Sequence, residues 1–179
     1  MNRRAARRIG LVAAAVTVVA VVAVLAGGTR VYRVASDSMG PAIAVGDLVV
    51  GAVSDGSDLE RGDVVVFADP GDWAETSARL AGSDAVAPVF VKRVLGLPGD
   101  RVACCDPGGE LTVNGARVVN DVRADPAGLA SVLAFDVSVP AGAMFVLGDN
   151  RRASIDSRYL GPVPLEAILA VERFVVPLP

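Results

Sequence analysis

The chain has 179 residues, which is enough for one globular domain and an additional segment. It contains no histidine and only two cysteines, which excludes an imidazole base and argues against a zinc site built on histidine and cysteine. The formal net charge is −3, and hydrophobic residues make up 53% of the chain, a high fraction for a soluble protein.

Residues 9–26 hold the excess of apolar side chains, with nothing more polar than Thr17. Extended by two glycines to residue 28, this segment would form a helix about 30 Å long, enough to cross a bilayer. Four arginines precede it: Arg3, Arg4, Arg7 and Arg8. Because basic residues stay on the cytoplasmic side, the sequence predicts a cytoplasmic tip (1–8), a transmembrane anchor (9–28) and an extracytoplasmic domain (29–179).

Two alternatives remain for the N-terminal segment. A cleaved secretory signal also combines a basic head, an apolar run and small residues, although its apolar core usually runs about 7–15 residues. The Arg3-Arg4 pair would also fit a twin-arginine export signal. We expect the uncleaved anchor because the apolar run is longer than a usual signal core.

The chain beyond residue 28 is acidic, with thirteen basic and twenty acidic residues. A domain that binds nucleic acid would present a basic face to the phosphates. Nucleic acid is therefore not an expected partner.

Short valine-rich runs alternate with Gly-Asp pairs in this part of the chain, a pattern typical of strands separated by turns. The dipeptide Asn114-Gly115 is a strong signal for a two-residue hairpin. We expect an all-β domain with strands at residues 47–53, 63–67, 89–95, 101–104, 111–119, 135–139, 144–147 and 170–176. Only SRYLGPVPLEAIL indicates a short helical turn, and residues 69–88 are expected to form a long loop.

Lys92 is the only lysine of the chain, which also holds sixteen arginines. In the expected strand it shares a face with Phe90 and Val94, since alternate side chains point the same way. Burial there would lower the pKa of the amine, and a drop of roughly two to three units would make Lys92 a general base near neutral pH. Arginine could not lose its proton in this way. Taken alone, however, such a lysine would more often be an exposed residue on an edge strand.

A partner for Lys92 is expected in the segment ASDSMGP, residues 35–41. A serine hydroxyl is a poor nucleophile until a base takes its proton, and a neutral lysine can act as that base. The alternative explanation of the SDS triplet is a polar turn, in which serines are common. The S-x-x-K pattern of penicillin-binding proteins is excluded, because position 89 is a valine.

Four stretches, in order, resemble the conserved boxes of the bacterial type I signal peptidases. They are SDSMGPAIAVGDLVV, RGDVVVF, VKRVLGLPGDRV and GDNRRASIDSRYLGPVP. Together with the N-terminal anchor, the resemblance covers essentially the whole chain. It implies a signal-peptidase-like Ser–Lys protease β-fold with one N-terminal transmembrane helix. The protein would lie in a bacterial cell membrane, with its N-terminus cytoplasmic and its catalytic domain extracytoplasmic.

The resemblance also implies roles for individual residues. Ser38 would be the nucleophile and Lys92 the general base. The backbone N–H of Ser38 and the hydroxyl of Ser36 would hold the oxyanion of the transition state. The supporting residues would be Ser154, which orients the lysine amine, the ion pair of Asp156 and Arg158 behind the site, and the nearby Arg93.

Some features of these boxes stay open. Gly40-Pro41-Ala42 departs from the commonest family pattern, which leaves the shape of the adjoining pocket undetermined. Asp149 and Asn150 could form a turn that holds Ser154, or could be metal ligands; we expect the turn and no metal. The adjacent pair Cys104-Cys105 could be a disulfide, which is permitted outside the cytoplasm, or a free buried pair.

The function implied is that of a membrane-anchored serine endopeptidase, a hydrolase that removes N-terminal signal peptides from exported preproteins and needs no cofactor. Substrates would carry small residues, typically alanine, at the first and third positions before the cut. A shallow apolar pocket would select them, lined by Val34, Met39, Ile43, Phe90 and Val91. The expected partners are signal peptides of exported preproteins, the lipid bilayer and the secretion translocon.

Two other functions remain open. A related serine–lysine protease could be dedicated to one secreted product, and a panel of preproteins would separate it from a general enzyme. A non-enzymatic, membrane-tethered β-domain could instead keep the fold and bind peptides. The joint presence of Ser36, Ser38, Lys92 and Ser154 argues against the binding domain, which has no need of all four.

Overall fold

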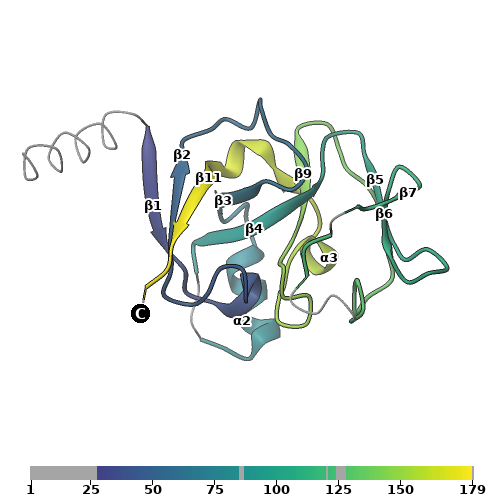
Figure 1. The fold of residues 1–179 in the computed structure, drawn as a ribbon, viewed down its shortest axis with the longest axis horizontal. Helices are drawn as coiled ribbons and strands as arrows, with labels where there is room; N and C mark the ends of the chain where they lie inside the picture. Colours follow the sequence, from purple (N-terminus) through teal and green to yellow (C-terminus); the bar gives the residue numbers. More distant parts are fainter. Residues whose placement is uncertain (1–27, 85–86, 120, 124–127, 179) are drawn as a thin grey trace, which may run out of the picture.

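A computed structural model describes residues 28–84, 87–119, 121–123 and 128–178. Within them, antiparallel strands form two sheets (Figure 1). The larger sheet contains β1 (Thr29–Arg33), β2 (Leu48–Ala52), β11 (Ile168–Val176), β3 (Val64–Ala68), β4 (Val89–Gly96), β9 (Ala143–Leu147) and β10 (Val163–Pro164), in this spatial order. The smaller sheet contains β7 (Ala116–Arg117), β6 (Leu111–Val113), β5 (Arg101–Cys104) and β8 (Phe135–Ser138).

The helical segments of the described residues are short. They are the 3-10 turns η1 (Asp37–Met39) and η2 (Leu165–Ala167) and the α-helices α2 (Trp73–Ala81) and α3 (Ser157–Leu160). In this part of the chain no helix combines the length and the apolar character needed to cross a membrane. The expected cytoplasmic tip and transmembrane anchor, residues 1–28, lie outside the described residues except for Gly28.

The mostly β character expected from the sequence is confirmed, and each expected strand has a counterpart. In the hairpin of β6 and β7, Asn114 and Gly115 have φ angles of 54° and 80°. Positive φ at both central residues is what a type I′ turn requires, so this prediction is also confirmed. The short edge strands β1 and β10 were not predicted, whereas SRYLGPVPLEAIL does contain the short turns α3 and η2.

The prediction of a continuous loop over residues 69–88 is wrong, because α2 occupies its centre. The helix begins after Asp72, and the carboxylate of Asp69 accepts hydrogen bonds from its first N–H groups, those of Trp73 and Ala74. Gly82 ends it in the left-handed conformation, with φ of 64°. Trp73 then packs edge-on against the rings of Phe67 and Phe90, at centroid distances of 5.5 and 5.6 Å. This long-range aromatic contact stabilises a helix of nine residues that would be marginal alone.

The two faces of β4 pack against different parts of the molecule. Phe90 and Val94 belong with α2 to one apolar cluster, which also contains Val65 and Phe67 of β3. Val89 and Val91 pack on a second cluster, which contains Val34 and Met39. The central strand β4 therefore separates an α2 side from a β1 side, and both sides border the candidate site.

Candidate active site

Ser38 lies in the middle of η1, immediately after the first strand of the larger sheet. The side chain of Met39 is completely buried and anchors the turn in the core. The loop after β9 holds η1 from the other side: the backbone N–H of Asn150 donates to the carbonyl of Ser38 (3.0 Å), and its side-chain amide donates to the carboxylate of Asp37 (2.8 Å). Both contacts hold in place the turn that carries Ser38.

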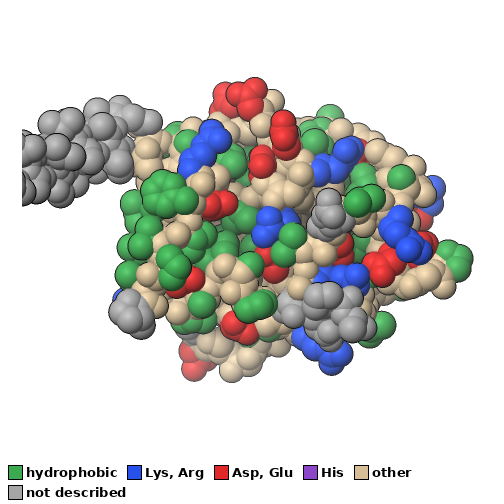
Figure 2. Space-filling model, in the orientation of Figure 1, with side chains coloured by type: hydrophobic (Ala, Val, Ile, Leu, Met, Phe, Trp, Pro, Cys, Tyr) green, Lys and Arg blue, Asp and Glu red, His purple; other side chains and the backbone are tan. Residues whose placement is uncertain are grey.

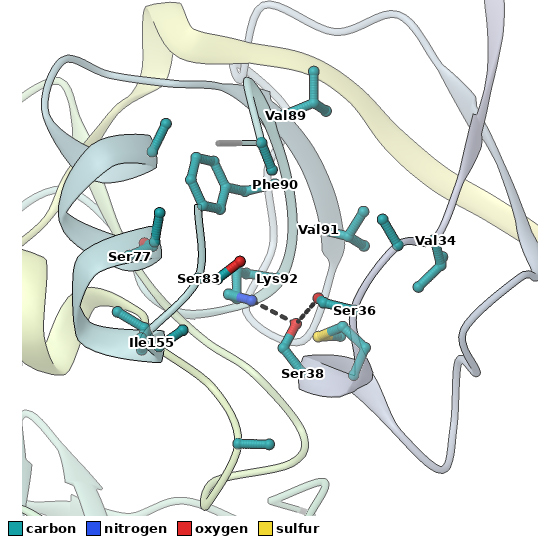
Figure 3. A pocket seen from close by; sticks show the side chains of 17 residues that line it. Val34, Ser36, Ser38, Ser77, Ser83, Val89, Phe90, Val91, Lys92 and Ile155 are labelled. Atoms are coloured by element: carbon teal, nitrogen blue, oxygen red, sulfur yellow. Dashed lines mark hydrogen bonds between the residues drawn. The ribbon is translucent and has the colours of Figure 1, made fainter. Parts of the chain in front are cut away.

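Lys92 projects from β4 toward Ser38 (Figure 3). Its Nζ lies 2.6 Å from Ser38 Oγ, within hydrogen-bond distance. The lysine is 4% exposed, and β4 is a central strand between β3 and β9. An exposed lysine on an edge strand, the alternative explanation of this residue, is therefore wrong.

Burial lowers the pKa of the Lys92 amine from its ordinary value of 10.5 to about 8. The main cause is desolvation, because a charged ammonium loses its hydration in the protein interior. Charges nearby have smaller effects: Asp156 and Asp149 raise the pKa, and Arg158 lowers it. A substantial fraction of the amine is consequently neutral near pH 8, as an acceptor for the Ser38 proton must be.

Ser36 brings a second hydroxyl to the nucleophile. Its Oγ donates to Ser38 Oγ over 3.2 Å, as Figure 3 shows. Ser36 has an extended backbone, directly precedes η1 and is exposed. The hydroxyl is near enough to reach an oxygen that develops charge beside Ser38.

A buried polar group stands behind the two catalytic candidates. Ser154 Oγ donates to Asp156 Oδ2 (2.7 Å), and the guanidinium of Arg158 donates to both oxygens of that carboxylate (2.7 and 2.8 Å). Asp156 is fully buried, and the ion pair with Arg158 compensates its charge. Among the described residues the Ser154 hydroxyl bonds to Asp156, and its orienting action on the Lys92 amine stays a prediction.

Gly148 was not identified from the sequence, although it begins the box GDNRRASIDSR. A Cβ built on it would clash with the hydroxyl of Ser154 and the carbonyl oxygen of Ser38. Its N–H donates to Asp156 Oδ2 (3.0 Å). The absence of a side chain at this position therefore lets the nucleophile turn and the supporting serine approach each other.

The acidic residue next to Gly148 forms an ion pair. Both carboxylate oxygens of Asp149 accept hydrogen bonds from Arg93, at 2.8 and 2.7 Å. Asn150 joins η1 to the loop and accepts a bond from the N–H of Ala153. Within the described ranges, no group of three or more acidic, histidine or cysteine residues could hold a metal ion.

A cavity of about 310 Å³ opens beside the two serines and the lysine. Four of the five residues predicted for a substrate pocket line it, namely Val34, Met39, Phe90 and Val91. The fifth, Ile43, is not brought to the cavity; it is buried in the cluster that contains Val34 and Met39. Residues of α2 that sequence reasoning missed form the opposite wall, among them Ala74, Ser77 and Ala78. Because a loop was expected over residues 69–88, the helical spacing of these residues was not recognised from the sequence.

The two cysteines lie away from this cavity, at the end of β5. Cys104 and Cys105 form a disulfide, which is one of the two states considered from the sequence. Cys104 belongs to the core cluster of the smaller sheet, and neither cysteine lines the cavity.

Comparisons with known proteins identify the family of this chain. The model of the family "Signal peptidase, peptidase S26" matches residues 6–177. Signal peptidase I of Leptolyngbya laminosa is 34% identical over 160 residues, which cover 84% of this chain and 73% of the relative. Signal peptidase I of Bacillus licheniformis is 32% identical over 154 residues, which cover 80% of this chain and 74% of the relative. A solved signal peptidase I from Enterococcus faecalis V583 is 28% identical with a TM-score of 0.47, covering 64% of this chain and 97% of that one. The chain belongs to the signal peptidase family, peptidase S26.

Proposed function

We propose that this protein is a signal peptidase I, a serine endopeptidase that removes N-terminal signal peptides from exported preproteins with Ser38 and Lys92. The observation that carries the proposal is the distance of 2.6 Å between Lys92 Nζ and Ser38 Oγ, at a lysine that burial keeps partly neutral. The family membership and the relatives named signal peptidase I supply the substrate class.

The dyad accounts for both halves of a peptide-bond hydrolysis. The neutral amine of Lys92 takes the hydroxyl proton as Ser38 Oγ bonds to the substrate carbonyl carbon. The tetrahedral intermediate then collapses, the C–N bond breaks, and the Lys92 ammonium gives its proton to the leaving amine. In the second half, Lys92 deprotonates a water that attacks the acyl carbon, and Ser38 regains its proton as the ester bond breaks.

Ser36 is the proposed side-chain donor to the oxyanion, together with the backbone N–H of Ser38. The position of the Ser36 hydroxyl 3.2 Å from the nucleophile supports this role. A donor that points to the place where charge develops stabilises the transition state by roughly 3–4 kcal/mol. Rotation of the Ser36 hydroxyl is enough to redirect its hydrogen bond from Ser38 Oγ to the substrate oxygen.

The edge of β4 beside the cavity supports binding of the substrate as an extended strand. Residues 89–92 pair with β3, whereas the register with β9 begins only at Arg93. A peptide laid along this edge would run between residues 89–92 and the segment around Ser36, both of which line the cavity. Its first and third side chains before the cut would then face Val34, Met39 and Val91, a shallow apolar surface suited to alanine.

The protein is proposed to act at a bacterial membrane, held by the helix expected at residues 9–28 with its N-terminus in the cytoplasm. Exposed apolar side chains at the β1 end of the larger sheet support this location. Val31 of β1 and Phe174 of β11 both lie opposite Val50 of β2, so they share one sheet face, and they are 51% and 54% exposed. Figure 2 shows hydrophobic side chains gathered over the β1–β2 end of the face in view. At this location the proposed partners are membrane lipid and the secretion translocon.

The decisive experiment is cleavage of a purified preprotein by the full-length protein in detergent, with Ser38→Ala as the matched variant. We expect wild type to release the signal peptide and the variant to be inactive with an unchanged thermal unfolding curve. Cleavage of many different preproteins would distinguish a general enzyme from one dedicated to a single product. Substantial turnover by pure Ser38→Ala would remove the nucleophile assignment.

A further inference from the structure

The cavity beside the dyad has two halves, separated by the edge of β4. Figure 3 shows Val91 directed toward Val34 on one side and the ring of Phe90 directed toward α2 on the other. The β1 half is the surface proposed above for the small first and third residues of the substrate. The α2 half is enclosed by Phe90 together with Ala74, Ser77, Ala78 and Ala81.

An extended peptide presents successive side chains to opposite sides. If the first and third side chains before the cut face Val34 and Val91, the second must face Phe90 and α2. We propose that the α2 half is a specificity pocket for the second residue before the cut, and that Ser77 is its selective residue. This inference rests on the proposed function and adds a substrate preference to it.

The shape of the α2 half leaves room for a side chain larger than alanine. Ala74, Ala78 and Ala81 follow one face of the helix at spacings of four and three, so small side chains cover the wall from end to end. The ring of Phe90 is directed toward the helix that carries Ser77 (Figure 3) and offers an aromatic face to an aliphatic stem. Residues such as leucine or glutamine fit this half, whereas the β1 half is suited to alanine.

Ser77 decides between an apolar and a polar occupant. Its hydroxyl oxygen is shielded from solvent, and it has no hydrogen-bond partner among the described residues. A buried hydroxyl without a partner is unfavourable in the free protein, so a ligand that bonds to it gains the whole interaction. Ser77 lines the cavity, so a rotation about its Cα–Cβ bond would turn the hydroxyl toward a bound side chain. Glutamine, which both donates and accepts through its side-chain amide, can then make this bond, and leucine of similar size cannot.

The test is a competition between preprotein peptides that differ only at the second position before the cut, with alanine at the first and third. Glutamine, leucine and alanine versions are mixed and cleaved by the full-length protein, and ratios of kcat/KM follow from product amounts. We expect the glutamine peptide to be cleaved roughly 3–10 times faster than the leucine peptide, as one hydrogen bond allows. In Ser77→Ala this preference should disappear while the leucine peptide is still cleaved. Thr76→Ala, a neighbour on α2 that does not line the cavity, should keep it.

A second variant tests the pocket without the hydroxyl. Ala81 is exposed at the last position of α2, where leucine is compatible with the helix. Ala81→Leu should reduce cleavage of the glutamine and leucine peptides relative to the alanine peptide, and Arg79→Leu, outside the cavity, should not. Cleavage with no preference at this position, or a preference that Ser77→Ala and Ala81→Leu leave unchanged, would refute the pocket while leaving the peptidase function intact. Failure to cleave any of the peptides would overturn the function and the pocket together.

Discussion

The guanidinium of Arg93 binds both carboxylate oxygens of Asp149, at 2.8 and 2.7 Å, and so joins the strand of the base to the loop of the supporting serine. Arg93 directly follows Lys92, and Asp149 directly follows Gly148. Because Asp149 is 1% exposed, its charge depends on this partner. The pair therefore sets the distance between β4 and the loop that carries Ser154, even though neither charge touches the dyad.

Breaking this ion pair should lower both stability and activity. Arg93→Met leaves a buried carboxylate without its partner, which costs roughly 3–5 kcal/mol of folding free energy. We expect a lower melting temperature in detergent and a reduced kcat. Arg61→Met is the control, because Arg61 pairs with Asp100 at a more exposed site away from the cavity. An Arg93→Met protein with wild-type stability and kcat would show that the pair does not position the loop.

The pH dependence of cleavage should report the Lys92 amine. Its pKa of about 8 lies below the ordinary value, so the neutral base is scarce at pH 6 and predominates above pH 9. The rate should rise about tenfold per pH unit up to pH 8 and then level off. Lys92 is the sole lysine, so amine labelling over a pH series, read by mass spectrometry, measures the same titration. A labelling midpoint near 10.5, or an active Lys92→Arg protein, would exclude Lys92 as the base.

The same lowered pKa predicts a cost in stability. The unfolded chain holds the lysine proton up to about pH 10.5, whereas the folded protein loses it near pH 8. Burial of the charged amine therefore costs folding free energy in full below pH 8. This cost disappears as the pH rises toward 10.5. Lys92→Met should therefore be inactive but more stable at pH 7, by roughly 2–4 kcal/mol. Chemical denaturation at pH 7 and pH 10.5 should show this gain shrinking at the higher pH. A gain that does not change with pH would have to come from packing alone.

The Gly-Asp turns could be predicted from sequence because their hydrogen bonds are local, whereas the pairing of Ser38 with Lys92, 54 positions apart, was expected only from the resemblance to a known family. In three of the pairs the aspartate accepts the N–H three residues earlier: Ala44 to Asp47, Glu60 to Asp63 and Leu97 to Asp100. The fourth, Asp149, was expected in a turn, yet its partner Arg93 lies 56 positions away. Such contacts, like those of Trp73 with Phe67 and Phe90, depend on tertiary packing that no short pattern encodes.

Ser36→Ala should separate oxyanion stabilisation from substrate binding. Loss of one donor to the transition state lowers kcat by roughly 10²–10³ with little change in KM. Steady-state kinetics on one preprotein peptide measures both constants. Ser54→Ala, at a serine that does not line the cavity, provides the control for a serine substitution. If KM rose while kcat stayed the same, Ser36 would be a binding residue instead of an oxyanion donor.

Ser154→Ala should be severely impaired while remaining folded. The substitution removes the hydroxyl that bonds to Asp156 and that is proposed to orient the amine of Lys92. A purely structural serine would change the melting temperature without changing the titration of the lysine. We expect the midpoint of Lys92 labelling to shift together with the loss of kcat. Full activity in Ser154→Ala would remove its supporting role.

Gly148→Ala adds only one methyl group and is predicted to inactivate the enzyme. A Cβ at position 148 would lie within 3 Å of Ser154 Cβ and would also clash with the carbonyl oxygen of Ser38, so the nucleophile turn and the loop must move apart. The position requires glycine because there is no room for a Cβ, and not because of the backbone conformation, since φ of Gly148 lies outside the left-handed region.

Since a displacement of about 1 Å can cost 10²-fold in rate, kcat should fall by at least that factor. The comparison is Arg152→Ala, which alters the same loop at an exposed position that does not line the cavity. Labelling of Ser38 by an acylating inhibitor should slow in parallel, because the displaced hydroxyl is no longer beside Lys92. A Gly148→Ala enzyme with normal kcat and normal acylation would mean that the close approach of Ser38 and Ser154 is not needed for catalysis.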